Sequence, residues 1–454
     1  MKTHFKDFTK LLMLLLAMTV AFTACNDEDE VILSSESEIS SFVFDGLTPA
    51  VTADVTGTTI TATVPYGTDV TSLTPTIMVS EEATLDPASG TAQDFTSPVS
   101  YTVTAEDGTE TTYTVTVTVE EATSLNVTPV LEFTEAESMV PDYFNMDNNE
   151  QEIAVNQNYI FVHSNNDQIV VHDITDGSVV GTMSAKEEAH QPYAATVNLF
   201  LAAIDTDDSG VILGTPRMAG PEKTFPVYKW NDKDAAQEVL FEYTKPLGYT
   251  IGNNINVVGD VSNDAQIYIP VEGTPNNVIL KFTITGGTPN TTPEMITVPN
   301  VTFGGVVDVA PVSDAADADL WVAGTGLKPT LISQQGNIIT SLPDGLASND
   351  AFLNIDYFEV DGNKVLVAED IDFNGAFADP PSSNPQKLVF IDVTDDPSVI
   401  TEDFLVRVDF SSSTDVHNGN GTGGIDVVVD ESAGTATVFG LITNAGVGIY
   451  TVDL

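Results

Sequence analysis

Apolar and polar residues alternate in short segments over most of the chain. The clearest case is 113–119, where a tyrosine and three valines occupy every second position and threonines stand between them. A period of two residues places the two kinds of side chain on opposite faces of a β-strand. Similar segments lie at 39–44, 59–65 and 99–104, and 106–109 has the composition of a tight hairpin turn. We therefore predict an immunoglobulin-like β-sandwich over residues 37–122.

The rest of the chain, residues 125–454, repeats a set of three apolar strands. The six sets span 152–174, 197–230, 255–284, 306–333, 353–393 and 425–454. A fourth strand follows each of the first five sets, the sixth set ends at the C-terminus, and one strand at 129–134 precedes the first set. We predict a six-bladed β-propeller in which 129–134 pairs beside 447–454, because such closure hides the sheet edges. The alternative is a two-sheet sandwich with long insertions. The fold class is all-β in either case.

Charge narrows the range of ligands. The chain has 454 residues, with 67 acidic against 14 basic ones and a formal net charge of −53. Nucleic acids, anionic lipid headgroups and polyanions all require a positive surface, so they are excluded as partners. No lysine or arginine lies between Lys10 and Lys186. We therefore expect a neutral or cationic ligand. The first domain also lacks His, Cys and Trp, which favours a spacer role over direct binding.

The N-terminus reads as an export signal. Three lysines precede the apolar run 11–22, which is too short to span a membrane, and small residues lead to Cys25. Residues 1–24 resemble a lipoprotein signal peptide. The resemblance implies that this peptide is cleaved off before Cys25 and that Cys25 is acylated. An ordinary secretory peptide is the alternative. The acidic run 26–30 resembles the surface-export signal of Bacteroidetes-type lipoproteins, and residues 25–36 are expected to form a flexible acidic tether.

The order of these segments resembles surface lipoproteins of Bacteroidetes surface-glycan (starch-utilisation-like) systems, with an Ig-like module and an uncharacterised propeller. The resemblance implies an outer-membrane protein, lipid-anchored and facing the cell exterior, that captures an extracellular glycan. It also implies a nutrient-uptake complex as a partner. None of the motifs behind this resemblance is catalytic.

Polar and aromatic residues cluster where the chain enters several innermost strands. Sugars need fixed amide or hydroxyl partners and a flat apolar ring, and these residues supply both. Ordinary turn chemistry of Asn is the alternative explanation. The candidate ligand-binding residues are His190, Tyr193, Tyr249, Asn253, Asn254, Asn354, His417, Asn418 and Asn420.

The longest loop of the same predicted face, 369–386, contains half of a calcium-binding pattern. Asp370, Asp372 and Asn374 alternate before Gly375, and Asp379 can act as a fourth ligand. Pro381 stands at the twelfth position, where an acidic residue is expected. Oxygen ligands without thiol or imidazole favour calcium. The fragment 205–210 is similar, but we assign it to a hairpin on the opposite face. Acidic surface turns are the alternative for both.

Enzymatic motifs are sparse. A sialidase-type propeller uses three arginines, and this chain has only Arg217 and Arg407. The glycines of 419–424 match G-x-G-x-x-G, but a strand follows them, so we expect a flexible entry to the last blade rather than a dinucleotide site. No serine nucleophile, zinc or haem motif is visible. We assign no catalytic residue. Binding of a neutral glycan is the leading hypothesis, and the alternatives are a structural subunit of an uptake complex and a glycoside hydrolase or lyase.

Overall fold

The computed structural model describes residues 33–47, 50–65, 68–119, 125–134, 150–164, 168–184, 201–219, 223–347, 351–371, 386–410, 423–443 and 445–453. Their regular structure consists of β-strands and single 3₁₀ turns: η1 (Val70–Ser72), η3 (Pro397–Val399) and η4 (Glu402–Phe404). The prediction of an all-β chain is therefore confirmed. The described residues include no helix that is both long enough and apolar enough to cross a membrane. The chain separates into two compact units between Glu121 and Ala122.

The first unit contains two sheets around one core. One sheet has the order β2 (Val51–Thr52), β1 (Ile39–Phe44), β5 (Thr76–Val79). The other has the order β3 (Asp54–Thr56), β4 (Thr59–Val64), β8 (Glu110–Val119), β7 (Val99–Thr104), β6 (Thr84–Asp86). Phe42 packs edge-to-face on both Phe44 and Tyr101 in the core. The predicted alternation in β8 is observed, since Tyr113 and Val115 are buried and the threonines beside them are not.

The described residues of the second unit form six four-stranded antiparallel sheets, numbered I to VI along the chain. Sheet I comprises β10 (Glu150–Val155), β11 (Tyr159–Ser164), β12 (Gln168–Asp173) and β13 (Val179–Ser184). Sheet II comprises β14 (Ala203–Thr206), β15 (Ile212–Thr215), β16 (Lys223–Trp230) and β17 (Glu238–Lys245). Sheet III comprises β18 (Asn256–Gly259), β19 (Ala265–Val271), β20 (Val278–Thr285) and β21 (Thr288–Thr297).

The later sheets follow the same order. Sheet IV comprises β22 (Asp308–Pro311), β23 (Leu320–Gly324), β24 (Leu327–Ile332) and β25 (Ile338–Ser341). Sheet V comprises β26 (Ala351–Val360), β27 (Asn363–Ile371), β28 (Lys387–Asp392) and β29 (Leu405–Asp409). Sheet VI comprises β30 (Gly423–Asp430), β31 (Thr435–Ile442), β32 (Gly446–Asp453) and, as its fourth strand, β9 (Asn126–Thr134). The predicted pairing of 129–134 beside the C-terminal strand is thus confirmed, with Val447 opposite Phe133.

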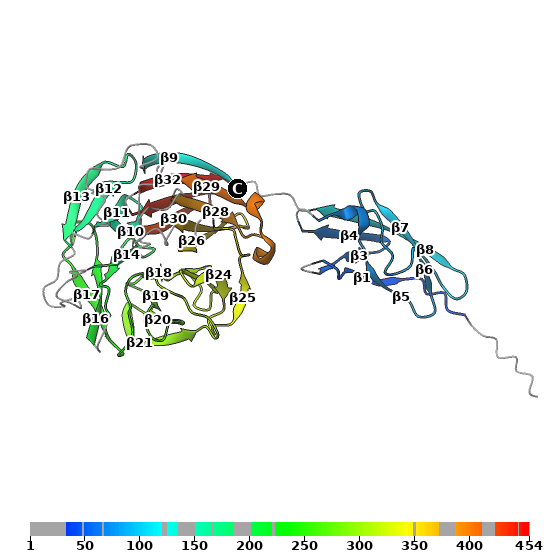
Figure 1. Ribbon diagram of the computed structural model, residues 1–454, viewed down its shortest axis with the longest axis horizontal. Helices are drawn as coiled ribbons and strands as arrows, with labels where there is room; N and C mark the ends of the chain where they lie inside the picture. Colours follow the sequence, from blue (N-terminus) through cyan, green and yellow to red (C-terminus); the bar gives the residue numbers. More distant parts are fainter. Residues whose placement is uncertain are drawn as a thin grey trace, which may run out of the picture. The chain divides into compact units, whose positions relative to one another are not determined.

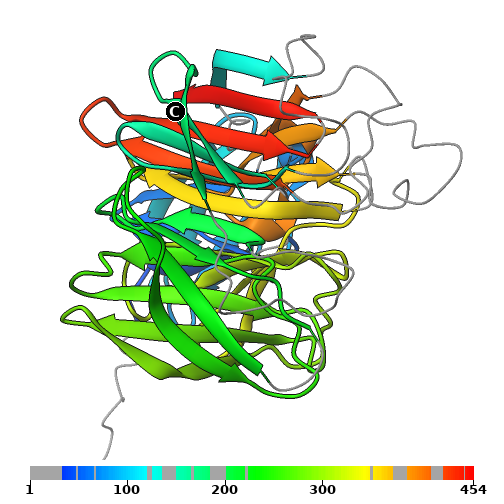
Figure 2. The same ribbon diagram turned by 90° about the vertical axis from the view of Figure 1, so that its left-hand side faces the viewer.

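The first strands of the six sheets surround a common axis. Each contacts the first strand of the next sheet, and β30 contacts β10. Figure 1 looks along this axis, with β10, β14, β18 and β26 towards the centre and β13, β21 and β25 at the periphery. Figure 2 shows the same sheets from the side.

A separate hydrophobic cluster fills each junction between neighbouring sheets. Phe161 and Trp230 belong to the cluster between sheets I and II, and Trp321 belongs to the one between sheets IV and V. Equivalent clusters join sheets II and III, III and IV, V and VI, and VI and I. Both tryptophans are buried. Each such side chain stabilises the fold by about 1.5–3 kcal/mol through burial, so packing between sheets fixes the geometry of the axis.

Candidate functional site

A cavity of about 930 Å³ lies among the first strands of the second unit. Residues of all six sheets line it. Its outer end is formed by the hairpins that join the first strand to the second in sheets I, II, IV, V and VI, through exposed residues such as Gln157, Asp208, Asp361 and Glu431. The volume is within the usual range for sites that hold small molecules. Of the described residues that line it, eleven are Asp or Glu and none is Lys or Arg.

Four of these acids occupy one repeated position. Ile or Val is followed by Asp205, Asp308, Asp356 or Asp426 in the first strand of sheets II, IV, V and VI. The same position holds Asn256 in sheet III and Ala154 in sheet I. Since these strands surround one axis, the repeat produces a ring of carboxylates. We call Asp205, Asp308, Asp356 and Asp426 the acidic ring.

The acidic ring joins neighbouring sheets by hydrogen bonds. Asp426 Oδ2 accepts from Val155 N at 2.6 Å, Asp205 Oδ2 from Val257 N at 2.6 Å, and Asp308 Oδ2 from Ile355 N at 2.9 Å. These bonds cross the junctions VI–I, II–III and IV–V, which are alternate junctions around the axis. The carboxylates are therefore fixed by the backbone, as a binding site requires.

Enclosure raises the pKa of every member of the ring. Loss of water raises the pKa of Asp308 to about 6 and that of Asp426 to about 7, although backbone N–H groups oppose the shift in both. The pKa values of Asp205 and Asp356 are well above the usual range, first through desolvation and then through the charge of Asp426. A carboxyl donates a hydrogen bond only while it is protonated. The raised pKa values therefore extend to higher pH the range in which the ring can donate hydrogen bonds as well as accept them.

Two further carboxylates lie beside the first residues of β30. A Cβ built on Gly424 would stand 1.8 Å from Glu152 Oε1, and one built on Gly423 would stand 2.3 Å from Glu369 Oε2. Burial raises the pKa of both glutamates well above the usual range. Of the glycines that we expected to give a flexible entry to the last sheet, Gly423 and Gly424 are instead strand residues that make room for these carboxylates, and Gly419 and Gly421 lie outside the described residues.

Several predicted ligand-binding residues hold acids in place. Asn354 is buried with a backbone φ of +44° and donates to Glu369 Oε2 at 2.7 Å. Asn254, also buried, hydrogen-bonds to Asp308. Asn253 hydrogen-bonds to Glu272, and the Tyr249 carbonyl accepts from Lys245 Nζ at 2.9 Å. The remaining candidates, His190, Tyr193, His417, Asn418 and Asn420, lie outside the described residues.

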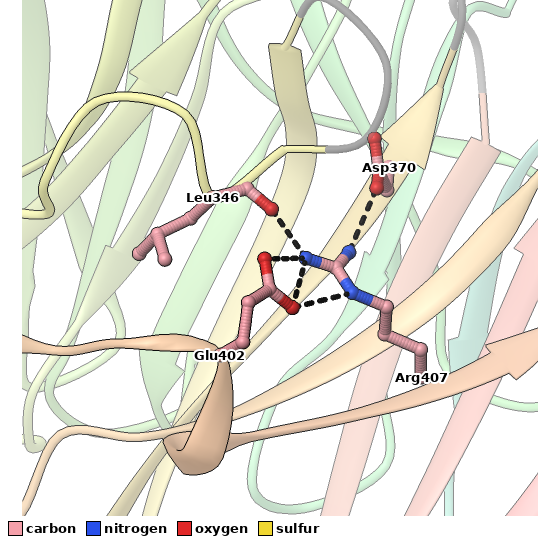
Figure 3. A network of polar contacts seen from close by, with 4 residues as sticks. All are labelled: Leu346, Asp370, Glu402 and Arg407. Carbon is pink, nitrogen blue, oxygen red and sulfur yellow. Dashed lines mark hydrogen bonds and ion pairs between the residues drawn. The ribbon is translucent and has the colours of Figure 1, made fainter.

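The start of the predicted calcium loop is part of an ion-pair network. Strand β27 continues to Ile371, so Asp370 is a buried strand residue. Its Oδ2 lies 2.8 Å from Arg407 Nη1, and Arg407 also donates to Glu402 and to the Leu346 carbonyl (Figure 3). Asp372, Asn374 and Asp379 lie outside the described residues. Within the described part of the chain, no three His, Cys, Asp or Glu residues are grouped to hold a metal ion. The calcium site stays a prediction.

The second acidic fragment, 205–210, forms the hairpin between β14 and β15, as we expected. Asp207 Oδ1 accepts from Ser209 N at 3.0 Å and Val211 N at 2.8 Å, and its Oδ2 accepts from Val261 N at 2.9 Å. The aspartates of this hairpin therefore bond to backbone amides, including those of sheet III.

The two histidines of sheet I do not form a metal pair. His163 is opposite Ile169 and His172 is opposite Ile160, so three positions along the strand separate them and their side chains point to opposite faces. His172 Nδ1 lies 2.8 Å from the Gly177 carbonyl. Desolvation lowers the pKa of His163 to about 3.

The sequence does carry a signal for the acidic ring that composition and motif searches miss. The signal is an Asp or Asn directly after Ile or Val, recurring once per set in five of the six sets. An acid at a fixed position of an apolar strand is costly unless it is paired or functional. Because the Asp or Asn recurs at the same position of successive sets, it indicates that the first strands of these sets surround a common axis.

Two family models match parts of the chain. Residues 39–117 match the family described as SGBP, N-terminal, where SGBP stands for surface glycan-binding protein. Residues 143–324 match a domain of unknown function, DUF8500. No curated protein matches the chain.

Solved structures also resemble the chain. A DUF4623 family protein from Bacteroides eggerthii DSM 20697 has a TM-score of 0.55 at 14% identity, covering 92% of this chain and 98% of its own. A protein described as secreted, from Bacteroides fragilis NCTC 9343, covers 19% of this chain and 98% of its own, with 21% identity and a TM-score of 0.16. The first of these likenesses concerns fold. The match of the first unit supports a surface glycan-binding protein of a Bacteroidetes system.

Proposed function

We propose that the chain is a cell-surface lipoprotein that binds a neutral extracellular glycan in the central cavity of its second unit. The observation that carries the proposal is the combination of a surface glycan-binding family match with a cavity of about 930 Å³ lined by backbone-fixed carboxylates. Carboxylates and carboxylic acids both form hydrogen bonds with sugar hydroxyls, and the excess of acids repels anionic polymers.

In this proposal the first unit is an immunoglobulin-like sandwich that acts as a spacer. The second unit is a six-bladed propeller. Six four-stranded sheets around one axis, and the closing pair β9–β32, support that architecture. Propellers commonly bind ligands along their axis, where residues from several sheets converge.

Binding can be tested by calorimetry on residues 26–454, which retain every described residue. The titrants are neutral oligosaccharides, with a polyuronate and a chitosan oligomer as the anionic and cationic counterparts. Tyr357 lines the cavity and is the ring most suited to stack on a sugar. We expect Tyr357→Ala to weaken binding about tenfold or more. Met295→Ala, on an exposed outer strand, is the matched control. Tight, salt-sensitive binding of the polyuronate would contradict the proposal.

The membrane anchor is proposed to be the lipid on Cys25. We expect Cys25→Ala to release the full-length protein into the soluble fraction of cells, because an acyl chain supplies the affinity for the bilayer. Membrane association unchanged by the substitution would rule out the anchor. The orientation is read separately, by protease treatment of intact cells.

For the loop after β27 we propose calcium as the bound cation. Calorimetry with calcium on the wild type and on Asp372→Ala tests it. We expect heat from the wild type alone. Because Asp370 is engaged by Arg407, only weak affinity is expected.

A glycoside hydrolase is the second candidate, and one observation favours it. Carboxyls with raised pKa values, such as those of Asp308 and Asp426, line the cavity, and a carboxyl that stays protonated near neutral pH can act as a general acid. Hydrolase activity would be established if the protein released reducing ends from a bound glycan and if this release were lost in Asp308→Asn and in Asp426→Asn. Binding of the glycan without release of product over a long incubation would favour the glycan-binding function over the hydrolase.

A further inference from the structure

Glu152 lines the deep part of the central cavity. It lies in β10 two residues before Ala154, which holds the ring position in sheet I, so its backbone is about 7 Å farther from the mouth than that position. The residue is only 9% exposed. Among the described residues it accepts one hydrogen bond, from Ile153 N to Oε1 at 3.3 Å, and its Oε2 accepts none. A buried carboxylate oxygen without a donor is uncommon in native proteins and calls for a partner.

The side chain of Glu152 extends towards the axis. Desolvation raises the pKa of Glu152, and the next largest cause is the charge of Asp308 in sheet IV, which stands opposite sheet I in the ring of six sheets. The charges of Glu369 and Asp205 raise the same pKa further. On the side of sheet VI the space beside Oε1 is open only because Gly424 has no Cβ. Carboxylates of several sheets thus surround Glu152 at the deep end of the cavity.

One member of the acidic ring also has an oxygen without a donor. The Oδ2 atoms of Asp205, Asp308 and Asp426 accept bonds from the neighbouring sheets. In contrast, Asp356 accepts from Tyr357 N at 2.7 Å through Oδ1, and no described residue donates to its Oδ2. All four ring residues line the cavity and are half-buried rather than buried. A molecule in the cavity can therefore reach Asp356 directly.

The charge of the lining indicates which ligand suits these oxygens. Enclosed carboxylates without a counter-charge are costly, and no described lining residue is Lys or Arg. A bound cation would supply the missing charge, and the exposed acids Asp208, Asp361 and Glu431 at the mouth would attract it. In the described part of the chain no three acids are grouped to hold a metal ion. An organic ammonium suits separated carboxylates better, because it has three N–H donors on a movable chain.

We propose that Glu152 and Asp356 bind a ligand that carries protonated primary amines. One ammonium donates to Glu152 Oε2 at the deep end, and the remaining N–H groups of the ligand donate to the acidic ring, first of all to Asp356 Oδ2. An amino sugar and a polyamine share this chemistry. The inference goes beyond the proposed function and shares with it only the cavity, because it does not depend on a neutral glycan.

Binding by enclosed carboxyls has a signature that exposed carboxyls lack. Burial raises the pKa values of Glu152 and Asp356, and also those of Asp205, Asp308 and Asp426 around them. An ammonium favours the ionised form of such a carboxyl, so binding near neutral pH releases protons to the buffer. Carboxyls with ordinary pKa values are already ionised at that pH and release none.

The test is calorimetry on residues 26–454 near pH 7 and at physiological ionic strength. The probes are spermidine and a glucosamine hexasaccharide, with the neutral N-acetylglucosamine hexasaccharide as the match of the second. Glu152→Gln keeps the shape of the side chain and removes its charge, so we expect it to weaken binding of the amine about tenfold or more. Asp356→Asn should weaken it as well. Asp344→Asn, which removes an exposed acid, is the control. Heat that varies with the ionisation enthalpy of the buffer reports the released protons.

The outcomes separate this site from the proposed function. Binding of the glucosamine hexasaccharide but not of its N-acetylated match supports an amino sugar, and binding of spermidine alone supports a polyamine. Amine binding that Glu152→Gln leaves unchanged is attraction to the acidic surface and overturns the proposal, as does a wild type that binds neither amine at millimolar concentration. Neutral glycans bound without either amine leave the proposed function standing. Should Glu152→Gln fail to fold, Asp356→Asn and the released protons decide.

Discussion

Some buried charged side chains of the second unit, such as Glu369 and Asp370, are held by partners from other strands. The network of Arg407 is an example with several partners. The Asp370 side chain has no exposed surface, whereas that of Arg407 is 18% exposed, and the guanidinium carbon lies 5.9 Å from the centre of the Phe352 ring. This one side chain therefore ties β29 to β27, to the 3₁₀ turn at Glu402 and to the carbonyl of Leu346.

Removing the arginine should be costly. In Arg407→Met the Asp370 carboxylate stays buried without its counter-charge, and breaking a buried pair in this way costs about 3–5 kcal/mol. We expect a large fall in the melting temperature of the second unit. Lys328→Met is the comparison, since its partner Asp344 is 94% exposed and such pairs contribute about 0–1 kcal/mol. Equal effects of the two changes would show that the network is not stabilising.

A single methyl group at Gly424 should also destabilise the fold. The added Cβ would lie 1.8 Å from Glu152 Oε1 and 2.8 Å from Ile153 N. The carboxylate can move, but the backbone nitrogen cannot, so we expect Gly424→Ala to cost about 1–3 kcal/mol. Gly181 lies in β13 with nothing near its Cβ position, which makes Gly181→Ala the matched control. Chemical denaturation of both variants measures the difference. A Gly424→Ala protein as stable as the Gly181→Ala protein would contradict the steric role.

At the scale of elements, the alternation of side chains was enough to locate the strands. The predicted segments 39–44 and 99–104, for example, coincide with β1 and β7. The fourth-strand role of β9 followed from the missing outer strand of the last set. Both inferences depend on local periodicity and on the need to pair edges, which a sequence displays directly.

The site was less accessible to sequence reasoning. Asp205 and Asp426 lie in different sheets, and only closure around the axis brings their charges together. Likewise, Asn354 lies in a predicted apolar strand, and the sequence does not show that its amide would be buried against Glu369. Contacts between sheets depend on register and rotation about the axis. Periodicity within one strand carries no information on either.

The closing strand gives a prediction at this scale. Deleting residues 1–136 removes β9 and leaves β32 without its outer neighbour, exposing backbone groups that now pair from Gly446 to Asp453. We expect a lower melting temperature and aggregation of the second unit, because a long free edge recruits other chains. A fragment starting at residue 122 is the control, since it keeps β9. Light scattering and thermal melts compare the two. A soluble fragment 137–454 with an unchanged melting temperature would contradict this account of closure.

At the scale of the whole molecule, the net negative charge destabilises the folded state. The formal charge of −53 repels itself in any compact state, and six carboxyls of the second unit are enclosed near one axis. Their raised pKa values mean that the folded protein binds protons that the unfolded chain releases. A proton is therefore a ligand of the native state, and stability depends on its concentration.

We predict that the second unit becomes more stable as the pH falls from 8 to about 6.5. An acid whose pKa is higher in the folded state than in the unfolded state stabilises the fold fully below its unfolded pKa, which is near 4. This contribution is lost as the pH rises through the folded pKa, which is about 6 for Asp308 and about 7 for Asp426. Each proton bound on folding contributes roughly 1.4 kcal/mol per pH unit. Below about pH 6.5 the gain diminishes, because burial lowers the pKa of His163 and of His172, and the unfolded chain then binds the protons.

The measurement is the melting temperature of the second unit from pH 8 to pH 5 at constant ionic strength. Asp426→Asn separates the ring from general charge repulsion. The amide oxygen can still accept from Val155 N, now bound to Asp426 at 2.6 Å, but the side chain no longer titrates. We expect a shallower dependence between pH 8 and 6.5 in this variant. Asp344→Asn, which neutralises an exposed acid, should keep the wild-type slope. If melting temperature depended equally on pH in all three proteins, the effect would be due to overall charge. The acidic ring predicts instead that Asp426→Asn differs from Asp344→Asn.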